Sequence, residues 1–129
     1  MLETIQTTNA ALPLGHYSQA VKYQNMLFLS GILPVSLGEE PFILLSFEDQ
    51  VDQVIQHMDA ILTASECTKE DIIKVTVYVT DVTKWPVFDK KYAAYIGSHK
   101  PARAVVPVPN LHHSFDVEIE IIARSVPGQ

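Results

Sequence analysis

Val117-Glu118-Ile119-Glu120-Ile121 alternates strictly between branched aliphatic and acidic side chains. Successive side chains of an extended strand point to opposite faces, so this stretch predicts one apolar face and one face that carries both glutamates. A strand of this kind fits a sheet that helices cover on one side only. We therefore expect the other side of the sheet to pack against a second copy of the chain.

A second apolar stretch, residues 102–108 (ARAVVPV), contains a single charged residue, Arg103. A guanidinium keeps its proton at any ordinary pH, so burying it is costly unless an anion or several acceptors meet it. Glu118 and Glu120 are the candidate acceptors, on strands that we expect to be neighbours. The group is then either a structural ion pair or part of an active site, since paired buried charges often serve no ligand.

The size and composition of the chain indicate one globular domain over residues 1–129. Its formal net charge is −6, and the basic residues are scattered. Because a nucleic-acid-binding protein normally carries a basic patch, no nucleic-acid partner is expected. The amino-terminal residues lack the basic start of a secretory signal, and no window reaches the roughly 18 apolar residues of a membrane span. We expect a soluble cytoplasmic protein with no membrane partner.

Periodicity predicts an α+β domain with two helices on one face of a sheet. Ser46, with Asp49 three residues later, resembles a capping box that starts the first helix. The predicted elements are two short strands within 18–29, an irregular loop marked by glycines and prolines at 31–41, a helix over 46–64, a short capped turn at 68–71, a strand over 72–80, a helix over 85–95, and strands over about 102–108 and 116–124.

Four motifs, in order along nearly the whole chain, resemble the signatures of the Rid family, the reactive-intermediate enamine and imine deaminases formerly named YjgF. The motifs are Gly15-His16-Tyr17-Ser18-Gln19-Ala20, Phe28-Leu29-Ser30-Gly31, Pro101-Ala102-Arg103 and Val117-Glu118-Ile119-Glu120. The resemblance implies a chorismate-mutase-like two-layer domain with a mixed sheet. It also implies a homotrimer with its sheets packed at the centre and with three clefts, each between two subunits.

The resemblance further implies hydrolytic deamination of 2-imino and enamino acids, such as 2-aminoacrylate, to 2-keto acids and ammonia. In this scheme Arg103 binds the substrate carboxylate, Glu118 holds or activates the attacking water, and Tyr17 completes the catalytic set. The expected substrate-binding residues are Ser30, Gly31, Ile32, Asp89, Val105 and His112. No metal and no organic cofactor take part. A guanidinium matches a carboxylate through two parallel hydrogen bonds, and Glu118 is expected to stay ionised beside it.

Several positions depart from the common family pattern. His16 and His112 stand where proline is usual, and Ile32 replaces a frequent glutamine. Asp89 takes the place of an asparagine, and Val105 takes that of a cysteine. The changed lining leaves the preferred imine and the Rid subgroup open.

Two other functions stay open on the sequence. The altered lining is compatible with a regulatory trimer that binds a small carboxylate without turnover. Some relatives carry the names ribonuclease or translation inhibitor, although the acidic net charge of this chain speaks against RNA binding. A metal site is not predicted, because the adjacent His112 and His113 point to opposite sides of an extended chain and have no acidic or cysteine ligand at motif spacing.

Overall fold

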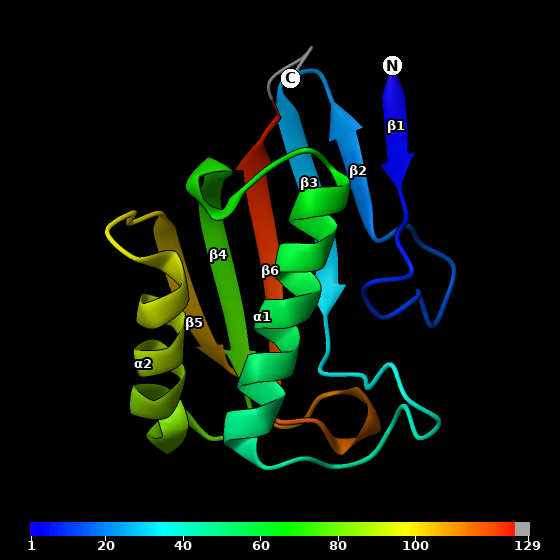
Figure 1. Cartoon of the computed structure of the whole chain (residues 1–129). Coiled ribbons are helices and arrows are strands. Elements are labelled where there is room, and N and C mark those ends of the chain that lie inside the picture. The colour runs from blue at the N-terminus through cyan, green and yellow to red at the C-terminus, as the bar shows by residue number, and fades with distance from the viewer. Residues whose placement is uncertain (126–129) are drawn as a thin grey trace.

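The computed structural model describes residues 1–125, which form a mixed six-stranded sheet with two helices on one face (Figure 1). The strand order is β1-β2-β3-β6-β4-β5. Strands β4 and β5 are parallel, and the other neighbouring pairs are antiparallel. The elements are β1 (Leu2–Ile5), β2 (Ala20–Tyr23), β3 (Met26–Ile32), α1 (Phe47–Ala64), β4 (Ile72–Val79), α2 (Trp85–Ile96), β5 (Ala102–Pro107) and β6 (Val117–Arg124). The α+β arrangement predicted from the sequence is confirmed.

Strand β6 lies inside the sheet between β3 and β4. Its Val117, Ile119 and Ile121 are buried in the core, while Glu118 and Glu120 point to the face without helices, as their alternation predicted. The same core contains the apolar stripe of α1, whose side chains recur at helical spacing. Buried members of that stripe are Val51, Val54, Met58, Ile61 and Leu62.

The structure differs from the sequence prediction in one additional strand and in the end of another. Leu2–Ile5 forms an edge strand that pairs with β2, and it was not expected because four residues are too few to show a clear alternation. Strand β3 runs on to Ile32, through Ser30 and Gly31, where the sequence indicated the start of a loop. A register shift between Leu29 and Ile32 interrupts the pairing of β3 with β6 at this point. This irregular end of β3 borders a cavity.

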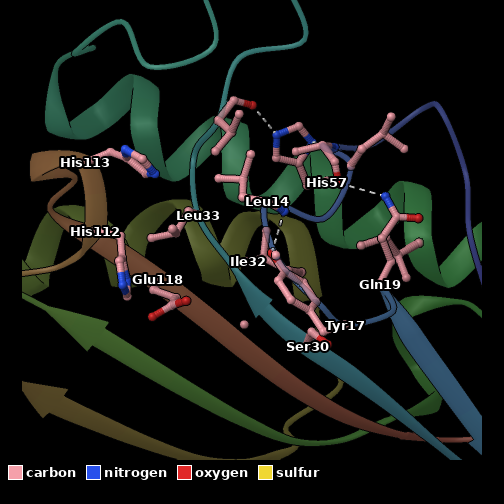
Figure 2. A pocket seen from close by; sticks show the side chains of 16 residues that line it. Leu14, Tyr17, Gln19, Ser30, Ile32, Leu33, His57, His112, His113 and Glu118 are labelled. Carbon is pink, nitrogen blue, oxygen red and sulfur yellow. Dashed lines mark hydrogen bonds between the residues drawn. The ribbon is translucent and has the colours of Figure 1, made fainter.

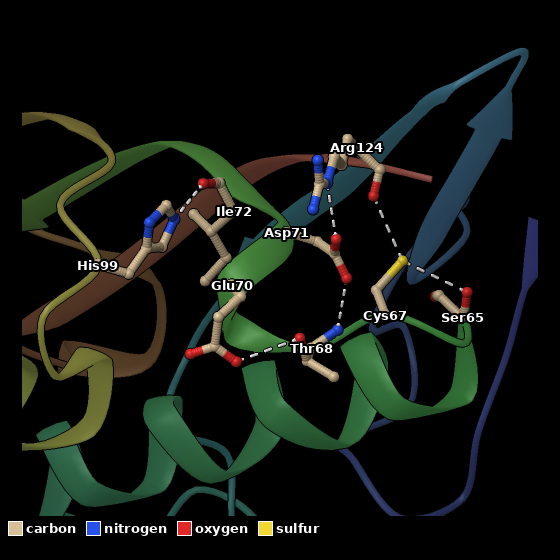
Figure 3. A network of polar contacts seen from close by, with 8 residues as sticks. All are labelled: Ser65, Cys67, Thr68, Glu70, Asp71, Ile72, His99 and Arg124. Atoms are coloured by element: carbon tan, nitrogen blue, oxygen red, sulfur yellow. Dashed lines mark hydrogen bonds and ion pairs between the residues drawn. The ribbon is translucent and has the colours of Figure 1, made fainter. Parts of the chain in front are cut away.

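A polar network at the start of β4 joins this part of the chain to the end of β6 (Figure 3). Asp71 accepts hydrogen bonds from the backbone N–H of Thr68 and from Nε of Arg124, each at 2.9 Å. Cys67 is buried beside it, with Sγ 3.5 Å from the carbonyl oxygen of Arg124. Burial raises the pKa of the Cys67 thiol, with the charge of Asp71 adding to the rise. The cysteine is therefore a packed, un-ionised side chain.

Neither helix of residues 1–125 combines the length and the apolar character that crossing a lipid bilayer requires. Helix α1 presents a polar face opposite its buried stripe, as expected of a helix that covers one face of a sheet.

Ser46 caps α1, because its side-chain oxygen accepts a hydrogen bond from the backbone N–H of Asp49 at 3.1 Å. We predict that Ser46→Ala lowers the stability of the protein by about 1 kcal/mol, since that N–H loses its partner at the helix start. Thermal unfolding at a fixed protein concentration measures the effect, and Ser46→Asp, which keeps an acceptor, serves as the control. Equal midpoints for Ser46→Ala and the unaltered protein would contradict this role.

Candidate functional site

One cavity, about 430 Å³, lies where the 11–19 loop, the end of β3, α1 and the 112–113 turn meet (Figure 2). We call it the glutamate cavity, because Glu118 of β6 is its acidic lining residue. Of the residues predicted from the sequence, six line this cavity. They are Tyr17, Ser30, Gly31, Ile32, His112 and Glu118.

The carboxylate of Glu118 lies against the backbone of Gly31. A Cβ atom built on Gly31 would come within 2.6 Å of Oε2 of Glu118, so a side chain at position 31 would displace the carboxylate. Burial raises the pKa of Glu118, the nearby Glu120 adds to the rise, and His112 opposes it. The arginine expected beside this carboxyl is not among the groups that act on its pKa within residues 1–125.

Hydrogen bonds hold Tyr17 and Ser30 at the edge of the glutamate cavity. The Tyr17 hydroxyl accepts a hydrogen bond from the backbone N–H of Leu14 at 3.3 Å, which leaves its own proton for another acceptor. The Ser30 hydroxyl donates to the carbonyl oxygen of Ser18 at 2.6 Å. The Ser30 N–H donates to the carbonyl oxygen of Gln19 at 3.0 Å, so β3 holds the segment that carries Tyr17.

Two buried polar side chains, Gln19 and His57, fix the loop that forms one wall of the cavity. The Gln19 amide donates to the carbonyl oxygens of Thr7 and Ala11, at 3.1 and 2.7 Å, and accepts from the N–H of Thr7 at 2.7 Å. His57 Nδ1 accepts from the N–H of Ala11 at 3.3 Å, while its Nε2 lies 2.6 Å from the carbonyl oxygen of Val35. The two His57 contacts fasten the loops at Ala11 and Val35 to α1.

His57 is neutral in this arrangement, because burial lowers its pKa. The sequence did not indicate His57 as a site residue. A signal was present, since a histidine at position 57 falls on the apolar face of α1, beside Val54, Met58 and Ile61. A polar side chain on such a face needs partners inside the protein, but its sequence position does not reveal which ones.

Arg103 lies on the edge strand β5 and lines a second cavity of about 460 Å³, the arginine cavity, which Asp89 and Tyr92 of α2 also line. Its Nη1 donates to Oδ1 of Asp89 at 2.8 Å. The guanidinium carbon is 4.5 Å from the ring centre of Trp85 and 5.0 Å from that of Tyr92, distances typical of cation–π contacts. The Arg103 side chain is 28% exposed.

The expected pairing of Arg103 with Glu118 or Glu120 is wrong within one subunit. Strand β4 lies between β5 and β6, so the two strands are not neighbours. Arg103 is in register with Val75, which is buried under the helices, whereas Glu118 is in register with Tyr78 on the open face. The arginine and the glutamate therefore lie on opposite faces of the sheet.

Different partners satisfy these charged groups. Asp89 accepts from Arg103, and Glu120 accepts from the Tyr78 hydroxyl at 3.2 Å. The sequence predicted Asp89 as a lining residue but not as the acceptor for Arg103, and it placed Trp85 only at the start of a helix. The helical spacing of positions 85, 89 and 92 could have placed all three side chains on one face of α2.

Tyr92 and Val105 lie on the same two elements, α2 and β5, as Asp89 and Arg103. The buried Tyr92 hydroxyl has no hydrogen-bond partner among residues 1–125. Val105 packs partly buried against the helix-covered core and is not among the described residues that line either cavity. Within the same part of the chain, no group of three or more histidine, cysteine, aspartate or glutamate side chains is placed to hold a metal ion.

The chain is similar to proteins of known family over nearly its whole length. The family model described as endoribonuclease L-PSP matches residues 7–125. A RutC family protein of Pyrococcus horikoshii is 41% identical over 95% of this chain and 98% of its own. The chloroplastic reactive intermediate deaminase A of Arabidopsis thaliana is 36% identical over 94% of this chain and 65% of its own. A solved Rid-family structure from Yersinia pestis, 33% identical, superimposes with a TM-score of 0.92 over 96% of this chain and 99% of that chain.

The raised pKa of Glu118 predicts a pH-dependent difference between the unaltered protein and Glu118→Gln. Because folding disfavours the ionised carboxylate, the stability that the neutral carboxyl contributes is complete below the unfolded pKa of about 4.3 and is lost as the pH rises through the folded pKa. The thermal midpoint of Glu118→Gln minus that of the unaltered protein should therefore increase as the pH rises and then become constant.

Thermal scans of both proteins across pH 4 to 8 measure this difference, and Glu40→Gln, in an exposed loop, controls for the loss of one carboxylate. A difference between the midpoints that decreases as the pH rises, or one that is independent of pH, would show that Glu118 is not held in a desolvated position.

Proposed function

The chain belongs to the endoribonuclease L-PSP family and has RutC and reactive intermediate deaminase relatives, and from this premise we propose that it hydrolyses reactive 2-imino and enamino acids to 2-keto acids and ammonia. The family resemblance found in its four motifs is confirmed. The name reactive intermediate deaminase belongs to the Arabidopsis relative and supports the reaction class. The observation that carries the proposal is the Glu118 carboxyl, half-buried against Gly31 in a cavity that Tyr17 also lines.

We propose that the complete site forms between two subunits of a homotrimer. Arg103 and Glu118 lie on opposite faces of one sheet. Strand β4 lies between β5 and β6, so the two strands are two strand spacings, or about 10 Å, apart. A small imino acid cannot contact both residues of the same chain across that barrier. Strand β5 is an exposed edge, and the open face of the sheet presents Phe28 and Val106, so both are available to a neighbouring subunit.

In this site Arg103 binds the substrate carboxylate. Its single hydrogen bond within residues 1–125, to Asp89, uses one of five N–H donors, so others can contact a ligand. Stacking on Trp85 and Tyr92 restricts the plane of the guanidinium and therefore the orientation of the bound carboxylate.

Glu118 acts on the water that attacks the imine carbon. The carboxylate takes one proton from the water as the water oxygen bonds to the imine carbon, and passes that proton to the imine nitrogen, which gives a carbinolamine. Glu118 then takes the proton of the new hydroxyl group and passes it to the nitrogen as the carbon–nitrogen bond breaks, which releases ammonia and leaves the keto group. A raised pKa makes the ionised Glu118 a stronger base, and general acid–base help of this kind contributes about 10² to 10⁴-fold.

A second candidate is a regulatory protein that binds a small carboxylate without turnover, and the ion pair of Arg103 with Asp89 favours it. Because Asp89 neutralises part of the charge in the arginine cavity, carboxylates would bind there reversibly and weakly. Saturable binding of a 2-keto acid by a protein that does not accelerate imine hydrolysis would support this candidate. RNA cleavage is not proposed, since the net charge of −6 opposes phosphate binding.

We predict that Arg103→Ala and Glu118→Gln each reduce the acceleration of keto-acid release from freshly generated 2-aminoacrylate by at least about 100-fold. Arg103→Ala removes the carboxylate contact, and Glu118→Gln removes the base. Lys90→Ala, which also deletes a cation but lies exposed on α2, is the matched control. Full activity in either site variant, with the oligomer intact, would refute the assigned role.

Mixing the two variants tests whether the site is shared between subunits. If each cleft takes Arg103 from one chain and Glu118 from its neighbour, random assembly of equal amounts of Arg103→Ala and Glu118→Gln restores about one quarter of the clefts. Co-refolded mixtures should therefore recover about one quarter of the normal activity, although each variant alone is inactive. No recovery would mean that both groups act from the same chain.

A further inference from the structure

We propose that the preferred substrate carries a large apolar side chain, branched aliphatic or aromatic, which lies in the inner part of the glutamate cavity. This inference rests on the proposed function and specifies its substrate. We call this inner part the apolar chamber, and its walls are Ala11, Leu14, Ile32, Leu33, Val35 and Ile61.

The glutamate cavity has a polar side and an apolar side. In Figure 2, Glu118, Tyr17 and Ser30 lie along one side of the cavity, whereas Leu33, Leu14 and the ring of His57 lie across from them. A substrate whose reacting carbon is placed near Glu118 therefore has its remaining substituent directed at the aliphatic groups. The reaction site and the chamber are parts of one continuous cavity.

The floor of the apolar chamber is built by the subunit itself. Ile32, Val35 and Ile61 are buried, and they belong to β3, the following loop and α1. A neighbouring subunit that covers the open face of the sheet would leave these side chains in place. The chamber is thus a property of the chain described here and does not depend on how the proposed clefts assemble.

The polar groups inside the chamber are already paired with the protein. Both nitrogens of His57 contact backbone groups, of Ala11 and Val35, and burial lowers its pKa so that the ring is uncharged. Both ends of the Gln19 amide are hydrogen-bonded to the 7–11 loop. A polar substituent placed among these groups would lose water without gaining partners, whereas an apolar one loses nothing.

The volume of the cavity also favours a large substituent. Cavities of about 300 to 1,000 Å³ typically hold ligands far larger than a three-carbon acid, and this cavity measures about 430 Å³. The methyl group of 2-iminopropanoate would leave most of the chamber unfilled. Each further methylene buried against its walls should raise kcat/KM about fourfold, which corresponds to about 0.8 kcal/mol.

A series of 2-imino acids tests the inference, each generated in the assay by an amino-acid oxidase acting on alanine, 2-aminobutyrate, norvaline, leucine or phenylalanine. We expect kcat/KM to rise along the aliphatic series, with the leucine-derived imine hydrolysed at least about tenfold more efficiently than the alanine-derived one. If the alanine-derived imine is hydrolysed as well as or better than the rest, the inference fails and the proposed function stands. If no imine is accelerated, the proposed function itself fails.

Ala11→Leu provides the structural test, because it places bulk in the chamber while the backbone N–H of Ala11 can still bind His57. The ratio of kcat/KM for the leucine-derived to the alanine-derived imine should fall at least about tenfold. Ala94→Leu, the same change at an exposed position of α2, is the matched control. An unchanged ratio in folded Ala11→Leu would overturn the inference.

Leu14→Ser is the second variant, chosen because Leu14 is half-exposed and its substitution leaves the core intact. It removes apolar wall without adding bulk, so it should also lower the leucine-to-alanine ratio, by about threefold to tenfold. A ratio equal to that of the unaltered protein in both variants would place the substrate side chain outside the chamber.

Discussion

The alternation of β6 at the interior of the sheet is the constraint on which the site depends. Burial of Val117, Ile119 and Ile121 against the helices forces Glu118 and Glu120 onto the open face. A slip of one residue would place two carboxylates in the core and three aliphatic side chains outside it. The same burial that stabilises the sheet therefore delivers Glu118 to the edge of a cavity and removes part of its hydration.

The walls of the glutamate cavity are fixed by hydrogen bonds from buried polar side chains to the backbone of the surrounding loops. His57 of α1 contacts backbone groups of Ala11 and Val35, which fastens two loops to the helix, and Gln19 binds the 7–11 loop to the segment before β2. Gly31 supplies the last requirement, the absence of a side chain where the carboxylate of Glu118 lies. Packing, hydrogen bonding and a missing Cβ atom together shape one site.

Arg103 is held by a different part of the fold. Asp89, Trp85 and Tyr92 come from one face of α2, and they orient the guanidinium on the helix side of the sheet edge. The two charged groups named from the sequence thus belong to separate cavities, each preformed by its own neighbours. The proposed function therefore requires the edge of one chain to meet the open face of another.

Apart from the edge strand β1, the sequence by itself determined the element types, their order and most of their bounds, because periods of 2.0 and 3.6 residues depend only on local burial. Its motifs also identified the family and the residues Tyr17, Ser30, Gly31 and Glu118 that meet in one cavity. The tertiary structure alone decided that β4 separates Arg103 from Glu118, since strand order is a property of long-range pairing and leaves no local trace. It likewise decided that His57 lies beside Ala11 and Val35, because those contacts join residues that are far apart in the chain.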